Sequence, residues 1–311
     1  MTTPKKKTVP TNEYHTDRFA PPIPAPPMPL KASAAIPTSA YSTPLTYFGS
    51  KKRLAPAIIS LFPPNFQNLT YIEAFGGGAA ILFAKPKSRL EIYNDLDGAA
   101  VNFFRVLRDD PAELKRRLTL TPFSRGEYEQ CRNGYEAVID PIEYARQYYV
   151  LIMQSFSKRF CAGWTFKRDT DTPGSFANKV DNLEWTAERL RGVMIEHLDF
   201  RKLIAKHDSD HAFWVCDPPY APTTRSSNAD KYRCEMTLQD HLDLLAMLKE
   251  VKGRVLLCGY YCEEYARALK GWEMRSASVQ SLSGRVGERR TETVWTNYSL
   301  PKPDNTIALA A

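Results

Sequence analysis

Residues 217–220 read Asp-Pro-Pro-Tyr and directly follow the apolar run 213–216. Proline donates no backbone N–H and biases the residue before it toward an extended conformation, so two prolines cannot continue a strand ladder. We therefore expect Asp217 at the carboxyl end of a buried strand, followed by a rigid turn that carries an aromatic ring. A cis-proline turn would account for the prolines, but not for the acid and the tyrosine that bracket them.

These residue types suit the activation of an exocyclic amine on a nucleobase, whose nitrogen lone pair is delocalised into the ring and is a poor nucleophile. Asp217 and the carbonyl oxygen of Pro218 can accept its two N–H bonds and localise that lone pair, while Pro219 keeps the turn rigid. Tyr220 offers a face on which the base can stack, typically worth about 1–3 kcal/mol per base. The amine loses its proton after the reaction, so no strong base is needed.

A second group of residues lies in the segment EAFGGGAA, residues 73–80. Glycines 76–78 after a strand allow the backbone to approach a ligand closely before a helix begins. Their spacing is not that of the dinucleotide fingerprint, and a tight turn without a ligand is the alternative. Glu73, directly before the turn, could face a positively charged group of a ligand.

Acids also end two further apolar runs. Asp95 follows Glu73 by about twenty residues, where nucleoside-binding sheets hold a ribose diol. Asp95 or Asp97 could instead cap the next helix, and Asp97 is the expected cap. Asp199 and Phe200 would suit the amine and the ring of an adenine, although a capping acid and a core phenylalanine would look the same.

The elements that must position these residues follow from the apolar pattern. Short apolar runs alternate with helical stretches, which indicates a parallel sheet with helices on both faces. Open sheets of this kind bind ligands at the carboxyl ends of their strands. The expected strands are 69–77, 90–95, 194–199, 212–217 and 254–260, and the expected helices include 99–107, 238–251 and 262–270. The runs 273–281 and 291–298 leave no room for a helix and predict an antiparallel hairpin closed by the basic loop 284–290.

Two segments lie outside this alternation. Residues 118–190 are rich in basic and aromatic residues, include a helical pattern over 142–158, and predict an inserted lobe. Residues 1–44 hold ten of the 23 prolines and indicate a disordered or extended arm. The expected core domain is then 45–117 together with 191–300, and residues 301–311 form a tail.

Composition limits the class of protein. A 311-residue chain with 43% hydrophobic residues can fold into a core domain with a second lobe. Its net charge of +7 favours a polyanionic partner, although a merely soluble basic protein would share it. No apolar run approaches the ~20 residues of a membrane span, and no secretory signal is visible, so we expect a cytoplasmic protein. The six scattered cysteines suggest buried free thiols, and no metal site is expected.

The order YFGSKK (47–52), EAFGGGA (73–79), inserted lobe and DPPY (217–220) resembles the Dam-type family of DNA adenine-N6 methyltransferases, in its alpha group. The resemblance covers residues 45–298. Ser50 stands where the family often has a second glycine, and Ala74 where it often has proline. The resemblance implies a Rossmann-like, S-adenosylmethionine-dependent methyltransferase sheet, an inserted target-recognition lobe, and methyl transfer to an adenine extruded from double-stranded DNA.

Residue roles follow from the same resemblance. Asp217, Pro218, Pro219 and Tyr220 match the catalytic motif, and Lys51 looks like the lysine that meets the carboxylate of S-adenosylmethionine. Asp95 is similar to the ribose-binding acid, and Asp199 with Phe200 to the pair at the cofactor's adenine. The implied cofactor contacts are Tyr47, Lys51, Glu73, Phe75, Gly76, Gly78, Asp95, Asp199 and Phe200.

Extrusion of a base costs a few kcal/mol, which phosphate contacts from basic side chains would offset. The expected contacts are Arg159, Lys167 and Arg168 in the lobe and Arg285, Arg289 and Arg290 in the hairpin loop, although each could be a solubilising charge. Residues 156–180 are the expected source of sequence readout.

Other activities remain to be weighed against this one. A cytosine-N4 methyltransferase more often has serine in place of the acid, and a non-catalytic DNA-binding protein could share the scaffold. A cytosine-C5 enzyme needs a cysteine nucleophile, usually in a Pro-Cys pair, which this sequence lacks. RNA and protein-amide methyltransferases more usually carry Asn before Pro-Pro. A restriction endonuclease partner and the DNA sequence that is read stay open.

Overall fold

The computed structural model describes residues 43–46, 49–224, 232–280 and 289–300. The proline-rich arm up to residue 42, Tyr47, Arg285 and the tail 301–311 lie outside these ranges. Chain packing begins slightly earlier than the sequence pattern indicates, because Thr43 and Leu45 are already buried. The hydroxyl of Thr43 donates to the backbone carbonyl of Gly78, which ties this first segment to the glycine turn.

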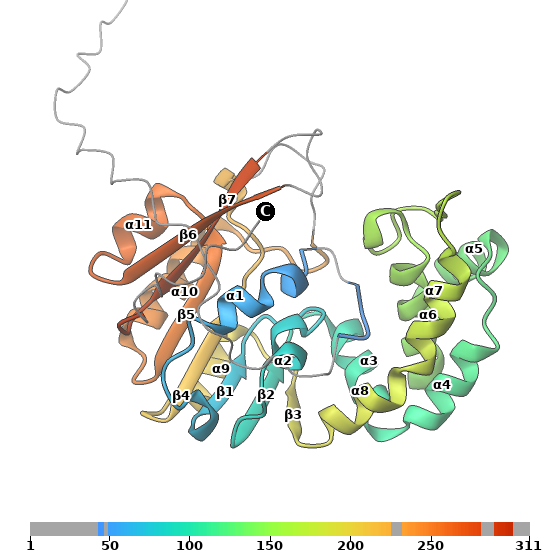
Figure 1. Ribbon diagram of the computed structural model, residues 1–311, viewed down its shortest axis with the longest axis horizontal. Helices are drawn as coiled ribbons and strands as arrows, with labels where there is room; N and C mark the ends of the chain where they lie inside the picture. Colours follow the sequence, from blue (N-terminus) through green and yellow to red (C-terminus); the bar gives the residue numbers. More distant parts are fainter. Residues whose placement is uncertain (1–42, 47–48, 225–231, 281–288, 301–311) are drawn as a thin grey trace, which may run out of the picture.

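In the described chain, seven strands form one sheet in the order β3-β2-β1-β4-β5-β7-β6 (Figure 1). Strands β1 to β5 are parallel, and β7 runs antiparallel to both β5 and β6. The strands are β1 Thr70–Glu73, β2 Leu90–Asn94, β3 Val193–Glu196, β4 Ala212–Cys216, β5 Arg254–Tyr260, β6 Glu273–Gln280 and β7 Arg289–Thr296. This is the Rossmann-like sheet with a carboxyl-terminal antiparallel hairpin that the sequence predicts.

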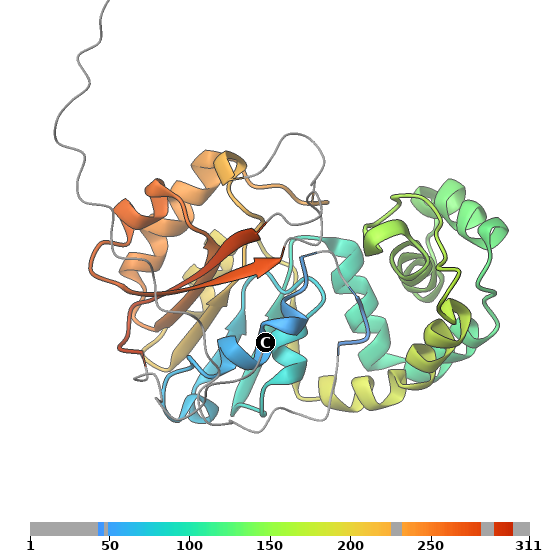
Figure 2. The same cartoon turned by 45° about the horizontal axis from the view of Figure 1, so that its top comes forward.

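Alternate residues of the central strands supply two separate cores, as the period of two in a strand requires. Tyr71 and Phe213 pack on one face, and Ile72 and Trp214 pack on the other. Helices cover both faces of the sheet (Figure 2). The helices outside the insertion are α1 Ala55–Ile59, α2 Ala80–Ala84, α3 Gly98–Asp109, α9 Phe200–His207, α10 Leu238–Glu250 and α11 Glu263–Ala268.

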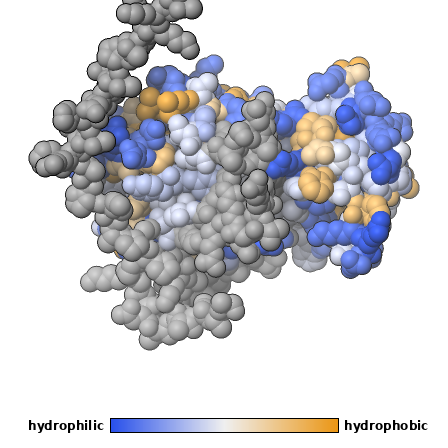
Figure 3. Space-filling view, turned by 90° about the horizontal axis from the view of Figure 1, so that it is seen from above, coloured by the Kyte–Doolittle hydropathy of each residue, from blue (hydrophilic) through white to orange (hydrophobic). Residues whose placement is uncertain are grey.

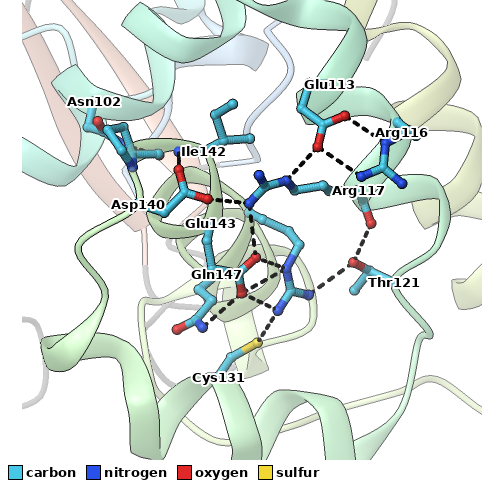
Figure 4. A network of polar contacts seen from close by, with 12 residues as sticks. Asn102, Glu113, Arg116, Arg117, Thr121, Cys131, Asp140, Ile142, Glu143 and Gln147 are labelled. Carbon is cyan, nitrogen blue, oxygen red and sulfur yellow. Dashed lines mark hydrogen bonds and ion pairs between the residues drawn. The ribbon is translucent and has the colours of Figure 1, made fainter.

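A helical lobe is inserted between α3 and β3, and most of it stands to one side of the sheet (Figures 1 and 2). Its helices are α4 Pro111–Thr119, α5 Arg125–Gly134, α6 Pro141–Met153, α7 Thr172–Asp181 and α8 Leu183–Leu190. Partly buried ion pairs brace its centre, where Arg146 donates to Glu127 at 2.6 Å and to Glu143 at 2.7 Å. Figure 4 shows the neighbouring bonds, including that of Arg117 to Glu113.

Some predicted boundaries are wrong, each for a local reason. The helix expected over 142–158 ends at Met153, because Ser155 turns into an isolated bridge with Trp164. The strands expected over 69–77 and 194–199 end at Glu73 and Glu196, where the regular ladder with β2 stops.

The basic hairpin loop expected over 284–290 does not extend to its last two residues. Arg289 and Arg290 already pair with Gln280 and Val279 as the first residues of β7. Arginine is a common residue in loops, but the pairing of β6 with β7 includes both of these arginines.

Among the described residues, no helix is long and apolar enough to cross a membrane, and the six cysteines are free thiols. No described peptide bond is cis, so the DPPY turn is not the cis-proline turn considered as an alternative.

Candidate active site

A pocket opens at the carboxyl ends of β1, β2 and β4. Strands β2 and β3 extend the sheet from β1 in one direction, while β4 and β5 extend it in the other. The strand order therefore reverses between β1 and β4, and open α/β sheets bind their ligands at such a reversal. The turn after β1, the acids after β2 and β4, the start of α9 and a segment after the DPPY motif line this pocket. Its walls include Lys51, Glu73, Phe75, Gly76, Gly78, Asp95, Asp199, Phe200, Asp217 and Pro219.

The glycine turn is shaped by close backbone approach. A Cβ atom on Gly76 would lie 2.2 Å from the ring of Tyr93, so no other residue fits there without displacing the ring. The hydroxyl of Tyr93 donates to the carbonyl of Gly77 at 2.9 Å, and Gly77 has φ of 47°. The predicted need for glycine is therefore a packing requirement as well as a matter of ligand access.

Asp95 holds the glycine turn in place. Its carboxylate accepts from the backbone N–H groups of Gly77 and Asp97, each at 2.7 Å. Burial raises the pKa of Asp95 to about 6, although these hydrogen bonds oppose the shift. Asp97 caps α3 by accepting from the N–H of Ala99 at 3.0 Å, as the sequence predicts.

Glu73 lies at the end of β1 and is almost completely buried. Burial raises its pKa to about 8, while the nearby Lys85 acts in the opposite direction. Its Oε2 atom has no hydrogen-bond partner among the described residues. A buried carboxyl group that lines a pocket in this way fits a cationic group on a ligand, because the ligand would compensate the carboxylate's lost hydration.

Asp199 and Phe200 begin α9 and also reach the pocket. Asp199 caps the helix by accepting from the N–H of Arg201 at 2.9 Å, and it forms an ion pair with the guanidinium of Arg201 at 3.2 Å. The ring of Phe200 is buried 5.9 Å from that of Phe75. The alternative roles considered for this pair, as a capping acid and a packed phenylalanine, are thus present alongside their position in the pocket.

Lys51 lies among the residues of the DPPY turn. Its ammonium group is 2.6 Å from Asp217 Oδ1 and 2.8 Å from the hydroxyl of Tyr220. The sequence resemblance implies instead a contact with the carboxylate of the cofactor. In the structure this ammonium already contacts Asp217 and Tyr220 of the DPPY motif.

Glu292 on β7 completes this network and was not found from the sequence. It lies 3.0 Å from the ammonium of Lys51, and its Oε1 accepts from the hydroxyl of Tyr220. Backbone pairing aligns it with Tyr260, whose ring packs 4.0 Å from that of Tyr220. In the sequence, Glu292 is marked only as an acid within the predicted strand 291–298, close to the apolar pair Val294 and Trp295.

The charges in this network shift the pKa values of its members. Burial raises the pKa of Asp217, Lys51 lowers it and Glu292 raises it again. Burial lowers the pKa of Lys51, but Asp217 and Glu292 outweigh it and leave this pKa well above the usual value. The lysine therefore stays charged and holds Asp217 through one oxygen, which leaves Oδ2 for another donor.

The residues predicted to bind DNA are only partly described. Lys167 and Arg168 are exposed on the lobe, and Arg159 is half-buried. Phe156 and Phe166, in the same part of the lobe, are 61% and 52% exposed. These two aromatic side chains are not among the residues predicted to bind DNA, because that prediction used only basic side chains. Figure 3 shows apolar patches on the lobe among hydrophilic ones.

Comparison with known proteins decides the family. The model of the D12 class N6 adenine-specific DNA methyltransferases matches residues 47–271. The chain belongs to this family. It is therefore an enzyme that methylates N6 of adenine in DNA, which favours the adenine reading over cytosine N4 and over a non-catalytic scaffold.

Two relatives match over most of their length. A type II methyltransferase of Lactococcus lactis subsp. cremoris, M1.LlaDCHI, is 26% identical over 270 residues, with 80% of this chain and 93% of the relative covered. A DNA adenine methylase of Haemophilus influenzae is 23% identical over 262 residues, covering 80% and 90%. The D12 family match ends before β7, so Glu292 lies beyond it.

Proposed function

We propose that this D12 methyltransferase takes the methyl group from S-adenosylmethionine and transfers it to an adenine extruded from double-stranded DNA at a specific sequence. The observation that carries the proposal is the position of Asp217. Its carboxylate is fixed by Lys51 at the end of β4 and faces the same pocket as Glu73, Asp95 and Asp199.

The pocket suits a nucleoside that bears positive charge. S-adenosylmethionine supplies an electrophilic methyl group on a cationic sulfur when it is bound. Glu73 would face the cofactor's positive charge, Asp95 would accept from the ribose hydroxyls, and Asp199 with Phe200 would hold the adenine. Phe75 and the glycine turn, including Gly76 and Gly78, would form the floor, and Tyr47 would contribute from outside the described residues.

At the reacting amine, Oδ2 of Asp217 and the carbonyl oxygen of Pro218 would each accept one N–H bond. This localises the nitrogen lone pair, which forms the new N–C bond as the S–C bond breaks. S-adenosylhomocysteine would be the leaving group, and the methylated nitrogen would then release its surplus proton to solvent. Pro219 fixes the direction of the turn, and the extruded base would stack against Tyr220, whose hydroxyl is held by Lys51 and Glu292.

The lobe would hold the DNA. We propose phosphate contacts from Arg159, Lys167 and Arg168, with Arg285, Arg289 and Arg290 acting from the hairpin. Lobe residues 118–190 would form the target-recognition domain on the catalytic domain 45–117 and 191–300. The helices α5–α8 lie within this lobe, whereas its first boundary falls inside α4. We further propose action in the cytoplasm, where the six free thiols stay reduced.

The test is incubation with methyl-labelled S-adenosylmethionine and unmethylated DNA, followed by digestion to nucleosides. We expect label in N6-methyladenine and a loss of about 100- to 1,000-fold in the Asp217→Ala variant, because an acceptor for the reacting amine is removed. Label in N4-methylcytosine, or equal activity of the variant, would contradict the proposal.

A further inference from the structure

A short strap, residues 232–237, covers one side of the pocket. Its residues 232–236 line the pocket, and it ends at Thr237, the N-cap of α10. Met236 is buried in the core beneath α10. At the other end, Tyr232 lies so close to Gly49 that a Cβ atom there would be 3.0 Å from the tyrosine hydroxyl. The strap therefore bridges the segment before Lys51 and the start of α10.

Arg233 in this strap contacts two parts of the molecule at once. Its Nε lies 3.0 Å from Oδ2 of Asp97, whose own backbone N–H donates to Asp95 at the pocket. Its guanidinium also lies 4.1 Å from the ring centroid of Phe160 and 5.7 Å from that of Tyr135, both in the lobe. One side chain thus joins the strap, the acid edge of the pocket and the lobe.

Arginine suits this contact, in which it meets Oδ2 of Asp97 as an ion pair without a hydrogen bond of good geometry. A planar guanidinium can present its edge to a carboxylate and its face to an aromatic ring, whereas an ammonium cannot do both. Asp97 is only 5% exposed and the Arg233 side chain 28%, so solvent screens the pair weakly. Phe160 packs 5.1 Å from Tyr135 and 5.8 Å from Tyr148. Its position is therefore set by the packing of the lobe.

We propose that Arg233 is a positioning residue that fastens the strap over the methyl-donor pocket and couples cofactor affinity to the placement of the lobe segment around Phe160. This inference rests on the proposed function, because it takes the pocket as the cofactor site and the lobe as the DNA-binding part. Coupling between two sites is reciprocal, so DNA that orders the lobe tightens cofactor binding, and bound cofactor tightens DNA binding by the same factor.

A double-mutant cycle tests the coupling. The dissociation constant of S-adenosylhomocysteine is measured by calorimetry, without DNA, for the wild type, Arg233→Lys, Phe160→Leu and the double variant. We expect about fivefold weaker binding for Arg233→Lys and about threefold for Phe160→Leu, with the double variant no weaker than Arg233→Lys alone. The fitted stoichiometry reports the folded fraction, so loss of folding is separated from loss of affinity.

Arg125 provides the matched control. Its guanidinium lies 4.8 Å from the ring of Trp164 in the same lobe, but it does not line the pocket. Arg125→Lys should leave the affinity for S-adenosylhomocysteine unchanged. In addition, duplex DNA should raise that affinity in the wild type and not in Arg233→Lys.

Two outcomes would overturn the coupling alone. If the effects of Arg233→Lys and Phe160→Leu multiply, Arg233 acts by direct contact with the ligand. If Phe160→Leu leaves the affinity unchanged, the lobe is not connected to the pocket. A wild-type protein that binds no S-adenosylhomocysteine would instead overturn the proposed cofactor, and with it this inference.

Discussion

Two lysines are buried among the residues that the structure describes. One belongs to the candidate active site and the other to a structural cluster, and their surroundings differ. Lys51 lies between the carboxylates of Asp217 and Glu292, which hold its pKa well above the usual value despite burial. Lys85 shares the single carboxylate of Glu91 with Arg189, and burial lowers its pKa to about 8.

The unused acceptors make the difference. Both oxygens of Glu91 accept bonds from Lys85 or Arg189, so that cluster joins α2, β2 and α8 with no carboxylate oxygen left over. In the network of Lys51, Oε2 of Glu292 has no hydrogen-bond partner in the described chain, and Lys51 uses only Oδ1 of Asp217. The structural cluster satisfies its own acceptors, whereas the cluster around Lys51 leaves carboxylate oxygens unused in the described chain and holds more negative than positive charge.

The largest expected effect concerns the structural cluster. Arg189→Met leaves Glu91 buried with one partner fewer, and we expect a loss of about 3–5 kcal/mol in the free energy of unfolding by urea. The triple variant Lys85→Met, Glu91→Leu, Arg189→Met removes all the buried charges together and should recover most of that loss. A cost below about 1 kcal/mol for the single variant would show that the cluster does not hold the lobe to the sheet.

The next effect concerns the active-site cluster. Glu292→Gln keeps an acceptor for Tyr220 but removes a charge that holds Lys51, so Asp217 is less well placed. We expect kcat to fall about 10- to 100-fold, with unchanged stability and unchanged affinity for S-adenosylhomocysteine. Glu263→Gln, in an exposed pair with Arg267, is the control and should have full activity. A fall in stability without a fall in kcat would place Glu292 with the structural cluster.

The third effect concerns Glu73 in the pocket, which belongs to neither cluster, and it should appear as a pH dependence of cofactor affinity. The pKa of Glu73 is about 8, so its carboxyl group is protonated below that pH in the free protein. A cationic ligand favours the ionised form, and binding then releases a proton. Affinity for S-adenosylmethionine should therefore fall about tenfold between pH 8.5 and 6.5, as measured by calorimetry in buffers of different ionisation enthalpy. Glu73→Gln should flatten this dependence, and a wild-type profile as flat as the variant's would exclude the role.

The smallest effect is expected at the lobe surface. Lys167→Ala should weaken DNA binding a few-fold on any sequence and reduce the slope of log affinity against log salt by about 1. Lys115→Ala, which removes a lysine on α4 that is paired with Glu184, is the control. Equal slopes for the wild type and Lys167→Ala would remove the phosphate contact.

Local sequence patterns were sufficient to predict much of the fold and about half of the residues at the candidate site. The run AFWVC is buried at every position, and the two prolines behind it stop the strand, so Asp217 could be placed from the sequence. Asp97 could be assigned as a helix cap for the same local reason. The end of α6 at Met153 could not, because it depends on a bridge between Ser155 and Trp164 that no apolar period reveals.

The sequence by itself determined the order of the strands along the chain, the acids at the ends of β1, β2 and β4, and the motifs of the D12 family. These features depend on neighbours within a few residues. Only the tertiary structure decided what Lys51 contacts and which acid completes the DPPY motif. Glu292 reaches Tyr220 across 72 residues through the register of β5 and β7. Arg233 reaches Phe160 across the boundary between sheet and lobe. Contacts of this kind are set by packing between distant segments, and no spacing in the sequence encodes them.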